Sequence, residues 1–582
     1  MRLRYSIAGG VTALMLQCAA SGASSPVADA AMNGDRALVR KLLQQKADVN
    51  APQPDGATAI QWAAYRADPD MADLLIAAGA NVKLANRDGA TPLFLASMNG
   101  SAAVIEKLLN AGADPNEPEP FGETPIMFAA RAGSLDAMKI LIDHKANVNA
   151  KESVRGTTAL MWAAGNGHAA AVKMLIDHGA NTNSVSDADT KGNKAYVAPT
   201  ARQRAINDGI ALDGTFVGNR RGRQQPAAAP KSSTPSAQDD VAAADEAAAA
   251  ASFGRQSDKD GGGLTALVYA AREDCLECVK VLIASGVDVN QTTRYGWTPL
   301  LTATQNRHYK LAEYLLEHGA DPNIANKGGW RPLYIATDNR NIEGGDYPVR
   351  KPDMDHLDYI KFLLDHGADV NARVCGSQST AEKCVGDSTE TRTNFTMQWL
   401  YEDGATPFLR AAQSGDVPLM KLLLARGADP KIATTNGDTA LMVAAGIGWV
   451  EGVTYEWSGA QTLEAVKLCL DLGLDPNAAD ADGRVALHGA GHKGSNSVVQ
   501  LLVDRGAKLD THDNGSRDTI SGSMLGHTWL PLDYAQGLVR VGVQSAIAHP
   551  ETAALIRNLM TERGMPIPPP LTSSICLAVV CQ

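Results

Sequence analysis

Cysteine is the residue type of this sequence whose spacing bears most directly on chemistry. Six of the eight cysteines form three close pairs: Cys275 with Cys278, Cys375 with Cys384, and Cys576 with Cys581. Local pairs of this kind predict three disulfides in a chain that works in an oxidising space. Of the other two, Cys18 would be removed with the predicted signal peptide, and Cys469 is a spare thiol at an apolar helical position, which is typical of core packing.

The pair of Cys275 and Cys278 also has the spacing of redox-active sites, and it falls where a helix is predicted to begin. A thiolate at that end of a helix would be stabilised by the helix dipole. No strand, helix, strand pattern surrounds the pair, however, and Val279 stands where haem attachment needs His. A structural bridge or two buried thiols is the favoured interpretation, and redox chemistry is the alternative.

The twelve histidines give little support for a metal site. Four share one slot at the end of a predicted helix, where a cationic or hydrogen-bonding side chain is favourable: His144, His178, His318 and His366. His488 and His492 are four residues apart, as zinc ligands can be, but the Glu of a metalloprotease helix is missing between them. Nucleophile-elbow, Walker and dinucleotide-binding motifs do not occur in the sequence. We therefore predict no catalytic residues, no metal and no cofactor.

A repeated phrase positions these residues. The phrase Thr-Pro-Leu-x-x-Ala-Ala recurs eleven times, strictly or in weakened copies, and Thr58, Thr91 and Thr124 are each 33 residues apart. Thr followed by Pro predicts a helix start, because the hydroxyl can accept from a free backbone amide and proline fits the first helical position. The Ala pair keeps this first helix thin, so that a second, leucine-rich helix can lie close against it. A Gly-Ala-Asp or Gly-Ala-Asn ending then predicts a left-handed cap.

This pattern resembles the ankyrin repeat family, from about Asp29 to about Met560. The resemblance implies an all-α solenoid of helix pairs joined by β-hairpin-like loops, with about eleven repeats that stack to complete a shared core. Residues 29–50 hold only the second half of a repeat and are predicted to cap the N-terminal end. The resemblance also implies a protein that binds another protein.

Breaks in the period predict the domain organisation. Repeats occupy residues 29–183 and 263–560, and the low-complexity stretch 184–262 between them is predicted to be a disordered linker. Inserts at 341–356 and 447–460 separate the two helices of a repeat, whereas those at 372–401 and 512–527 lengthen loops between repeats. A Pro-rich tail with the last Cys pair follows at 561–582. Whether the two repeat blocks stack into one array stays open.

The N-terminus and the composition predict where the protein works. Arg2 and Arg4 precede an apolar run at 7–16 and then small residues, so residues 1–23 are predicted to be a signal peptide of an exported bacterial protein, periplasmic or secreted. Gln17 before Cys18 makes lipidation the less favoured alternative. No other stretch has the length and apolarity of a membrane span. The net charge of -11 argues against a nucleic-acid partner. We expect the protein to be a monomer.

The resemblance also implies which residues meet a partner protein. In ankyrin proteins the hairpin loops and first helices line a concave face. The corresponding residues here are Tyr65, Arg66, Met98, Asn99, Phe121, Arg131, Arg155, Asn166, Arg272, Tyr295, Trp297, Gln305, Asn306, Trp330, Asp338 and Asn339. Trp297 and Trp330 hold equivalent places, and they are either exposed binding anchors or indoles packed over their own hairpins. A small-molecule or glycan receptor that uses them and the aromatic inserts is the alternative function.

Overall fold

The computed structural model describes residues 25–187, 262–341, 351–374, 403–449, 455–515, 528–539 and 547–568. These ranges contain 24 helices and no strand, which confirms the all-α prediction. The chain divides into two compact units, residues 1–153 with 157–182 and residues 154–156 with 183–582. The predicted signal peptide and most of the predicted linker lie outside the described residues. So do four of the paired cysteines, namely Cys375, Cys384, Cys576 and Cys581.

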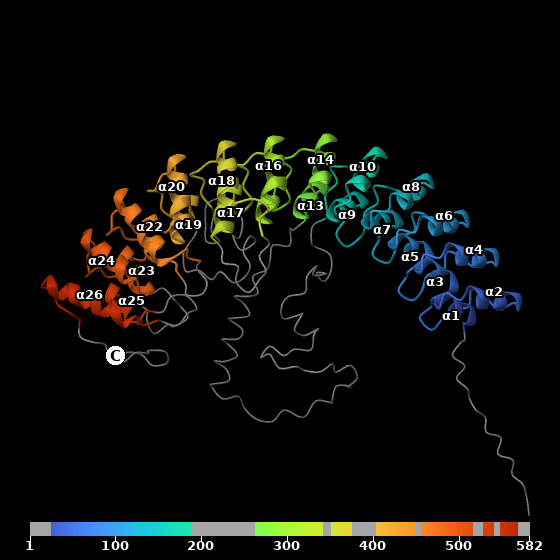
Figure 1. The fold of residues 1–582 in the computed structure, drawn as a ribbon, viewed down its shortest axis with the longest axis horizontal. Helices are drawn as coiled ribbons and strands as arrows, with labels where there is room; N and C mark the ends of the chain where they lie inside the picture. Colours follow the sequence, from blue (N-terminus) through green and yellow to red (C-terminus); the bar gives the residue numbers. More distant parts are fainter. Residues whose placement is uncertain are drawn as a thin grey trace, which may run out of the picture. The chain divides into compact units, whose positions relative to one another are not determined.

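Five helix pairs form the first unit. They are α1 (Pro26–Met32) with α2 (Arg36–Gln44), α3 (Ala59–Tyr65) with α4 (Pro69–Ala77), α5 (Pro92–Met98) with α6 (Ala102–Asn110), α7 (Pro125–Ala132) with α8 (Leu135–Asp143), and α9 (Ala159–Gly165) with α10 (Ala169–Asp177). The first helices α1, α3, α5, α7 and α9 form one row, and their partners form a second row (Figure 1).

Seven helix pairs form the described part of the second unit. They are α13 (Ala266–Arg272) with α14 (Leu276–Ala284), α15 (Pro299–Gln305) with α16 (Tyr309–Glu317), α17 (Pro332–Arg340) with α18 (His356–Asp365), α19 (Pro407–Gln413) with α20 (Val417–Ala425), α21 (Ala440–Ala445) with α22 (Gly459–Asp471), α23 (Ala486–Lys493) with α24 (Asn496–Asp504), and α25 (Pro531–Ala535) with α26 (Pro550–Glu562). Long gaps within a pair separate α17 from α18, α21 from α22, and α25 from α26.

The N-terminal repeat is a complete helix pair, so the prediction of a half-repeat cap is wrong. Helix α1 begins with Pro26 after Ser25 and buries Val27, Ala28, Ala30 and Ala31. Ser25 stands 33 residues before Thr58, so Ser25-Pro26-Val27 is a weakened copy of the repeated phrase. The apolar side of α1 packs against α2 and α3, which is why this segment folds as a repeat.

The repeated phrase starts the first helices in the way the sequence predicts. Thr91 Oγ1 accepts a hydrogen bond from the Phe94 amide at 3.2 Å, and Thr298 Oγ1 accepts from the Leu301 amide at 3.0 Å. Each hydroxyl satisfies an amide that has no partner inside its helix. The Ala pairs that follow are fully buried, as at Ala129 and Ala130, which leaves room for the second helix to pack closely.

An asparagine ladder joins consecutive repeats beyond the second helices. Asn323 Nδ2 donates to the Gly367 carbonyl at 2.9 Å, and its Oδ1 accepts from the Asp369 amide at 2.8 Å. The same two bonds recur at Asn50, Asn116, Asn149, Asn290, Asn371 and Asn477. The carbonyl belongs to the left-handed cap residue, which is glycine with φ +84° at Gly367 and Lys145 with φ +70° in one repeat. The ladder therefore ties each cap to the repeat before it.

The loops that lead into the first helices are hairpin-like turns joined to one another. Asn86 N donates to the Ala90 carbonyl at 3.1 Å and closes one turn, while Arg87 N donates to the Asp55 carbonyl of the preceding turn at 3.0 Å. Lys327 N makes the same contact with the Tyr295 carbonyl at 2.9 Å. These single bonds fix the loops beside the first helices, where a partner-binding surface would lie.

Candidate interaction surface

The first helices of the N-terminal unit present one row of exposed side chains. The row consists of the residues seven positions after the N-caps Ser25, Thr58, Thr91 and Thr124, and we call it the seventh-residue row: Met32, Tyr65, Met98 and Arg131. Met32 and Met98 are each 37% exposed and Tyr65 is 53% exposed, although all three are large and apolar. Arg131 is exposed as well. Three neighbouring repeats thus leave apolar surface in water at the same place.

Hydrogen bonds between repeats hold this row in position. Arg66 Nη1 donates to the Met32 carbonyl at 3.2 Å, and Asn99 Nδ2 donates to the Tyr65 carbonyl at 2.7 Å. His168 Nε2 contacts the Arg131 carbonyl at 3.0 Å. Met32, Tyr65 and Arg131 are therefore each fixed through the backbone by the next repeat, so the surface is preorganised.

An aromatic series lies on the same helices, nearer the hairpins. Phe94 and Phe128 meet edge to face with ring centroids 4.6 Å apart, and Phe128 meets Trp162 in the same way at 5.2 Å. Trp62 is half-buried, contacts Tyr65 edge to face at 5.9 Å and donates its indole N–H to Gln53 Oε1 at 2.6 Å. The sequence reasoning missed these four aromatics. Their signal was an aromatic residue three or four positions after the N-cap in each of four repeats.

The electrostatics of this surface differ from those of the whole chain. Helices α3, α5, α7 and α9 contain no Asp or Glu, whereas Arg131 and the C-cap residue Arg66 are exposed on them. Asp29 on α1 accepts a hydrogen bond from Gln53 Nε2 at 2.6 Å. The Arg131 guanidinium lies 5.9 Å from the centroid of the Trp162 ring. These four helices and their C-caps thus carry positive charge only, although the chain has a net charge of -11.

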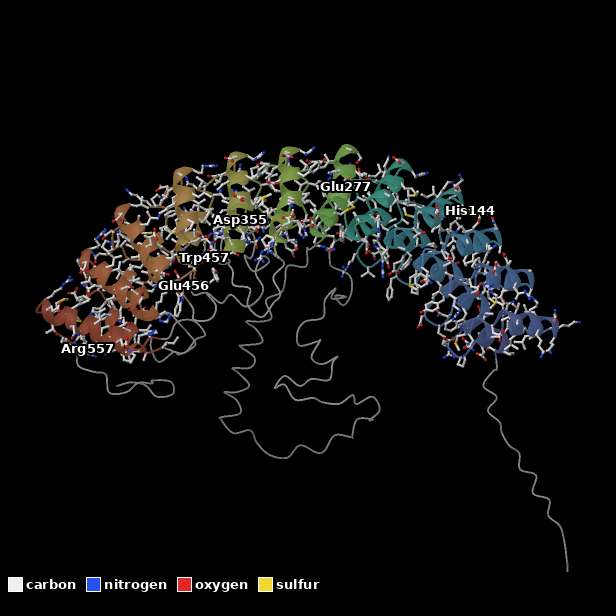
Figure 2. All side chains as sticks on the ribbon, viewed as in Figure 1. His144, Glu277, Asp355, Glu456, Trp457 and Arg557 are labelled. Carbon is white, nitrogen blue, oxygen red and sulfur yellow. A yellow bond between two sulfur atoms is a disulfide. The ribbon has the colours of Figure 1, made fainter. Side chains whose placement is uncertain are left out.

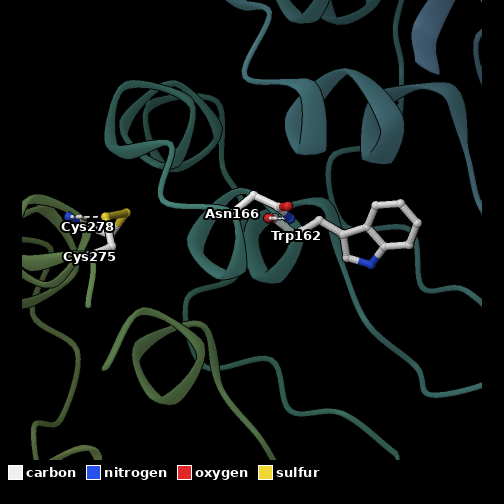
Figure 3. Close-up of a disulfide and its surroundings, with 4 residues drawn as sticks. All are labelled: Trp162, Asn166, Cys275 and Cys278. Carbon is white, nitrogen blue, oxygen red and sulfur yellow. Dashed lines mark hydrogen bonds between the residues drawn. A yellow bond between two sulfur atoms is a disulfide. The ribbon is translucent and has the colours of Figure 1, made fainter. Parts of the chain in front are cut away.

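One hairpin beside this surface has an exposed aromatic tip and a buried acid. Phe121 is 62% exposed, and Glu119 in the same loop is 9% exposed. Burial raises the pKa of Glu119 to about 7, and the Thr91 amide and hydroxyl near its Oε1 oppose that shift. The other expected contacts on the N-terminal repeats, Asn166 and Arg155, are exposed, and Asn166 Nδ2 donates to the Trp162 carbonyl at 2.8 Å (Figure 3).

The expected contact residues of the second unit fall into two groups. Arg272 is exposed, with its guanidinium 4.9 Å from the Tyr269 ring, and Tyr295, Trp297, Gln305 and Asn306 are half-buried. Trp330, Asp338 and Asn339 are buried, at 1%, 5% and 5% exposure. The expectation that these three face a partner is wrong.

The buried indole of Trp330 packs against an aromatic ring of its own repeat. Its ring meets Tyr334 edge to face with centroids 4.9 Å apart. Its backbone closes the hairpin, since Trp330 N donates to Asn326 Oδ1 at 3.0 Å and its carbonyl accepts from the Asn326 amide at 3.1 Å. Trp297 and Trp330 are therefore not a pair of exposed anchors.

Asp338 and Asn339 belong to a buried polar network between α15, α17 and α19. Arg410 Nε donates to Asp338 Oδ1 at 2.7 Å, and these side chains are 3% and 8% exposed. Arg410 also donates to Ser414 Oγ at 2.9 Å and to the Asn341 carbonyl at 2.8 Å. Asn339 Nδ2 donates to the Thr304 carbonyl at 2.8 Å. Because Arg410 is buried, its charge needs a buried carboxylate.

The insert before α22 covers one end of this network. Trp457 Nε1 donates to Asn341 Oδ1 at 3.0 Å, and the Arg340 guanidinium lies 4.5 Å from the Trp457 ring. Arg340 Nε in turn donates to the fully buried Asp416 at 2.7 Å. Figure 2 labels Trp457 and its neighbour Glu456 on this segment. Trp457 keeps 37% of its surface exposed, so it acts as a cover and leaves one side open.

The three cysteines among the described residues are bonded or buried in the fold. Cys275 and Cys278 are bonded to each other at the start of α14 (Figure 3), with Cys275 9% exposed and Cys278 fully buried. Cys469 is a buried free thiol. One of the three predicted disulfides is thus present. The other two, Cys375 with Cys384 and Cys576 with Cys581, lie outside the described residues and stay predictions.

Several histidine rings form hydrogen bonds with the backbone of the fold. His488 is buried, and both its ring nitrogens have protein partners, the Val485 amide at 3.0 Å and the Trp529 carbonyl at 3.1 Å. The histidines at the ends of second helices bond to their own helices, with Nδ1 within 2.7 to 2.9 Å of the carbonyl four residues earlier at His178, His318 and His366. His144 is the C-cap of α8 (Figure 2).

Membrane-spanning helices were not expected outside the predicted signal peptide. Among the described residues, no helix is both long enough and apolar enough to span a bilayer.

Stacked pairs of short helices, Thr-Pro helix starts and hairpin loops that bond in series define an α-helical repeat solenoid built to display side chains. A family model for ankyrin repeats in sets of three matches residues 27–119, 99–186, 242–326, 267–374 and 408–513. The chain belongs to the ankyrin-repeat family, whose repeats form protein-interaction scaffolds and are generally not enzymes.

Several known proteins are similar to part of this chain. The chain is 31% identical over 159 residues to the ankyrin repeat and SOCS box protein 16 of Mus musculus, which covers 26% of this chain and 34% of that protein. It is 32% identical over 171 residues to the probable E3 ubiquitin-protein ligase XBOS33 of Oryza sativa subsp. japonica, covering 26% and 30%. A serine/threonine-protein kinase 12 of Arabidopsis thaliana is 45% identical over 51 residues, covering 9% and 11%. The matched segments span about a third or less of these relatives.

Proposed function

We propose that the chain is an exported, non-catalytic scaffold, acting as a monomer, that binds a partner protein on the first helices of residues 25–182. The observation that carries the proposal is the seventh-residue row, where Met32, Tyr65 and Met98 expose apolar surface in three consecutive repeats. Large apolar side chains exposed at the same position of neighbouring repeats form a candidate interaction surface, because apolar surface gathered on one face marks binding sites in soluble proteins.

The composition of the row suits binding. Tyrosine is enriched among residues that dominate binding energy, and methionine adapts its shape to a partner. Because the backbone of the row is held by hydrogen bonds between repeats, such as that from Asn99 to the Tyr65 carbonyl at 2.7 Å, little backbone conformational entropy is lost on docking.

Site-specific crosslinking tests the proposed surface. A photo-reactive amino acid placed at Tyr65 or Met98 is expected to capture the same protein in intact producing cells. The control position is Leu135 on α8, which is also exposed, at 36%, but lies in the row of second helices. Capture from Leu135 and not from Tyr65 or Met98 would contradict the proposal.

We also propose a periplasmic or secreted location. The arginines and apolar run of residues 1–23 support export, and the bond between Cys275 and Cys278 is of a kind that persists in oxidising spaces. Cell fractionation combined with alkylation of free thiols tests both points. Full-length protein in the cytoplasm with Cys275 and Cys278 alkylated before reduction would contradict the location.

A small-molecule or glycan receptor has less support. That alternative relied on Trp297 and Trp330 as a pair, and Trp330 is only 1% exposed. Trp457 belongs to one of the aromatic inserts, but its indole N–H already donates to Asn341 and its ring already contacts the Arg340 guanidinium.

A further inference from the structure

Resting on the proposed partner-binding role, we infer that the seventh-residue row binds an extended, acidic segment of the partner. Its pattern is three apolar residues at intervals of three, followed after three more residues by Asp or Glu. The apolar residues would contact Met32, Tyr65 and Met98, and the carboxylate would pair with Arg131.

The spacing of the row sets the apolar interval. Packed neighbouring helices lie about 8–10 Å apart, and an extended ligand in the polyproline II conformation advances about 3.1 Å per residue with three residues per turn. Every third side chain of such a ligand therefore returns to the same face about one repeat further along the stack. The fourth position of the row is Arg131, and the fifth is Gly165, which offers no side chain.

The residues next to the row favour an extended ligand over a helical one. Three asparagines lie there, and in each the Nδ2 group donates a hydrogen bond to a backbone carbonyl: Asn33 at 2.9 Å, Asn99 at 2.7 Å and Asn166 at 2.8 Å. No donor in the described part of the chain bonds to their Oδ1 atoms. An extended ligand has unpaired backbone N–H groups to donate to such oxygens, whereas a helix uses its own internally.

The charges of the surface favour an acidic ligand. Arg66 and Arg131 are exposed, and helices α3, α5, α7 and α9 have no carboxylate to neutralise them. Two acids close to these helices are already engaged, since Asp68 pairs with Arg36 at 2.5 Å and Asp29 accepts from Gln53 at 2.6 Å. Guanidinium groups bind carboxylates in bidentate geometry, which suits recognition of Asp or Glu.

Selection of peptides against the intact folded chain tests this inference. The probe is a random dodecapeptide library displayed on phage, and enriched peptides are then synthesised and titrated by fluorescence polarisation. We expect three apolar residues at three-residue intervals and a carboxylate three residues further on. We expect Arg66→Glu/Arg131→Glu to weaken these peptides by about tenfold or more.

Matched variants keep the outcomes distinct. Arg40→Glu/Lys83→Glu makes the same change of charge at exposed positions away from the first helices, and is expected to change affinity by less than about twofold. Circular dichroism and thermal melting establish that each variant folds.

Each other result overturns something specific. Peptides that are neutral or basic, or that space apolar residues by seven as a helix would, overturn the inference. If such peptides still lose binding in Tyr65→Ser/Met98→Ser, the proposed function survives. If no peptide is enriched, or if the enriched peptides bind Arg66→Glu/Arg131→Glu and Tyr65→Ser/Met98→Ser as tightly as the wild type, the row is not a binding site. That result would contradict both this inference and the proposed function.

Discussion

Removing the carboxylate of Asp338 is expected to destabilise the second unit strongly. Arg410 is 3% exposed, and among the described residues it donates to Ser414 Oγ, to the Asn341 carbonyl and, at 2.7 Å, to Oδ1 of its charged partner Asp338. In Asp338→Ala the guanidinium stays buried without its counter-charge. Breaking a buried ion pair on one side costs about 3–5 kcal/mol.

Urea denaturation followed by circular dichroism and tryptophan fluorescence measures the effect. With a urea dependence of about 2–3 kcal/mol per M, the transition of this unit should move down by about 1–2.5 M. Asp338→Leu/Arg410→Met replaces both charges by apolar groups and is expected to recover most of the loss.

An exposed Arg–Asp ion pair with the same N–O distance provides the control. Arg426 Nη1 lies 2.7 Å from Asp365 Oδ1, and these side chains are 32% and 60% exposed. Asp365→Ala should cost less than about 1 kcal/mol, because water screens the pair. Equal losses in Asp338→Ala and Asp365→Ala would refute the conclusion that Asp338 is a core residue and would return it to the candidate surface.

Three further changes test separate parts of the structure. Lys145→Gly relieves a left-handed backbone with φ +70° and is expected to stabilise the first unit by about 0.5 kcal/mol in thermal melts, whereas a lower melting temperature would contradict the strain. Asn371→Leu removes bonds to the Gly427 carbonyl at 3.1 Å and the Asp429 amide at 2.8 Å, and should cost about 1–3 kcal/mol in urea; no loss would mean that the ladder contributes nothing. The pKa of Glu119, raised to about 7 by burial, favours its protonated form in the folded state, so its contribution to stability is present below about pH 4.5 and lost as pH rises through 7. Glu119→Gln should therefore match the wild type at pH 4 and exceed it at pH 8.5, and equal stability at both pH values would contradict the shift.

Much of the fold follows from local chemistry and could be predicted from the sequence. The period of 33 residues, the Thr N-caps and the cap glycines depend only on near neighbours, and Thr91, Thr298 and Gly367 behave as expected. The first repeat was missed because Ser25-Pro26 replaces Thr-Pro and directly follows the small residues of the predicted signal peptide.

The candidate surface was harder to predict because burial depends on contacts far away in sequence. Trp297 and Trp330 occupy equivalent slots, yet Trp330 is buried against Tyr334. Asp338 looked like a surface residue by position, but Arg410, 72 residues later, makes it a core residue. No repeat pattern shows such a partner in advance.

The central claim is that partner binding depends on the seventh-residue row. The direct measurement is the affinity of the crosslinked partner, purified, for Tyr65→Ser/Met98→Ser compared with Leu38→Ser/Leu135→Ser. The second pair also removes exposed apolar side chains, at 41% and 36% exposure, but from α2 and α8. We predict that the first pair weakens binding by about tenfold or more and the second by less than about twofold. Equal losses, or a larger loss from the second pair, would contradict the account.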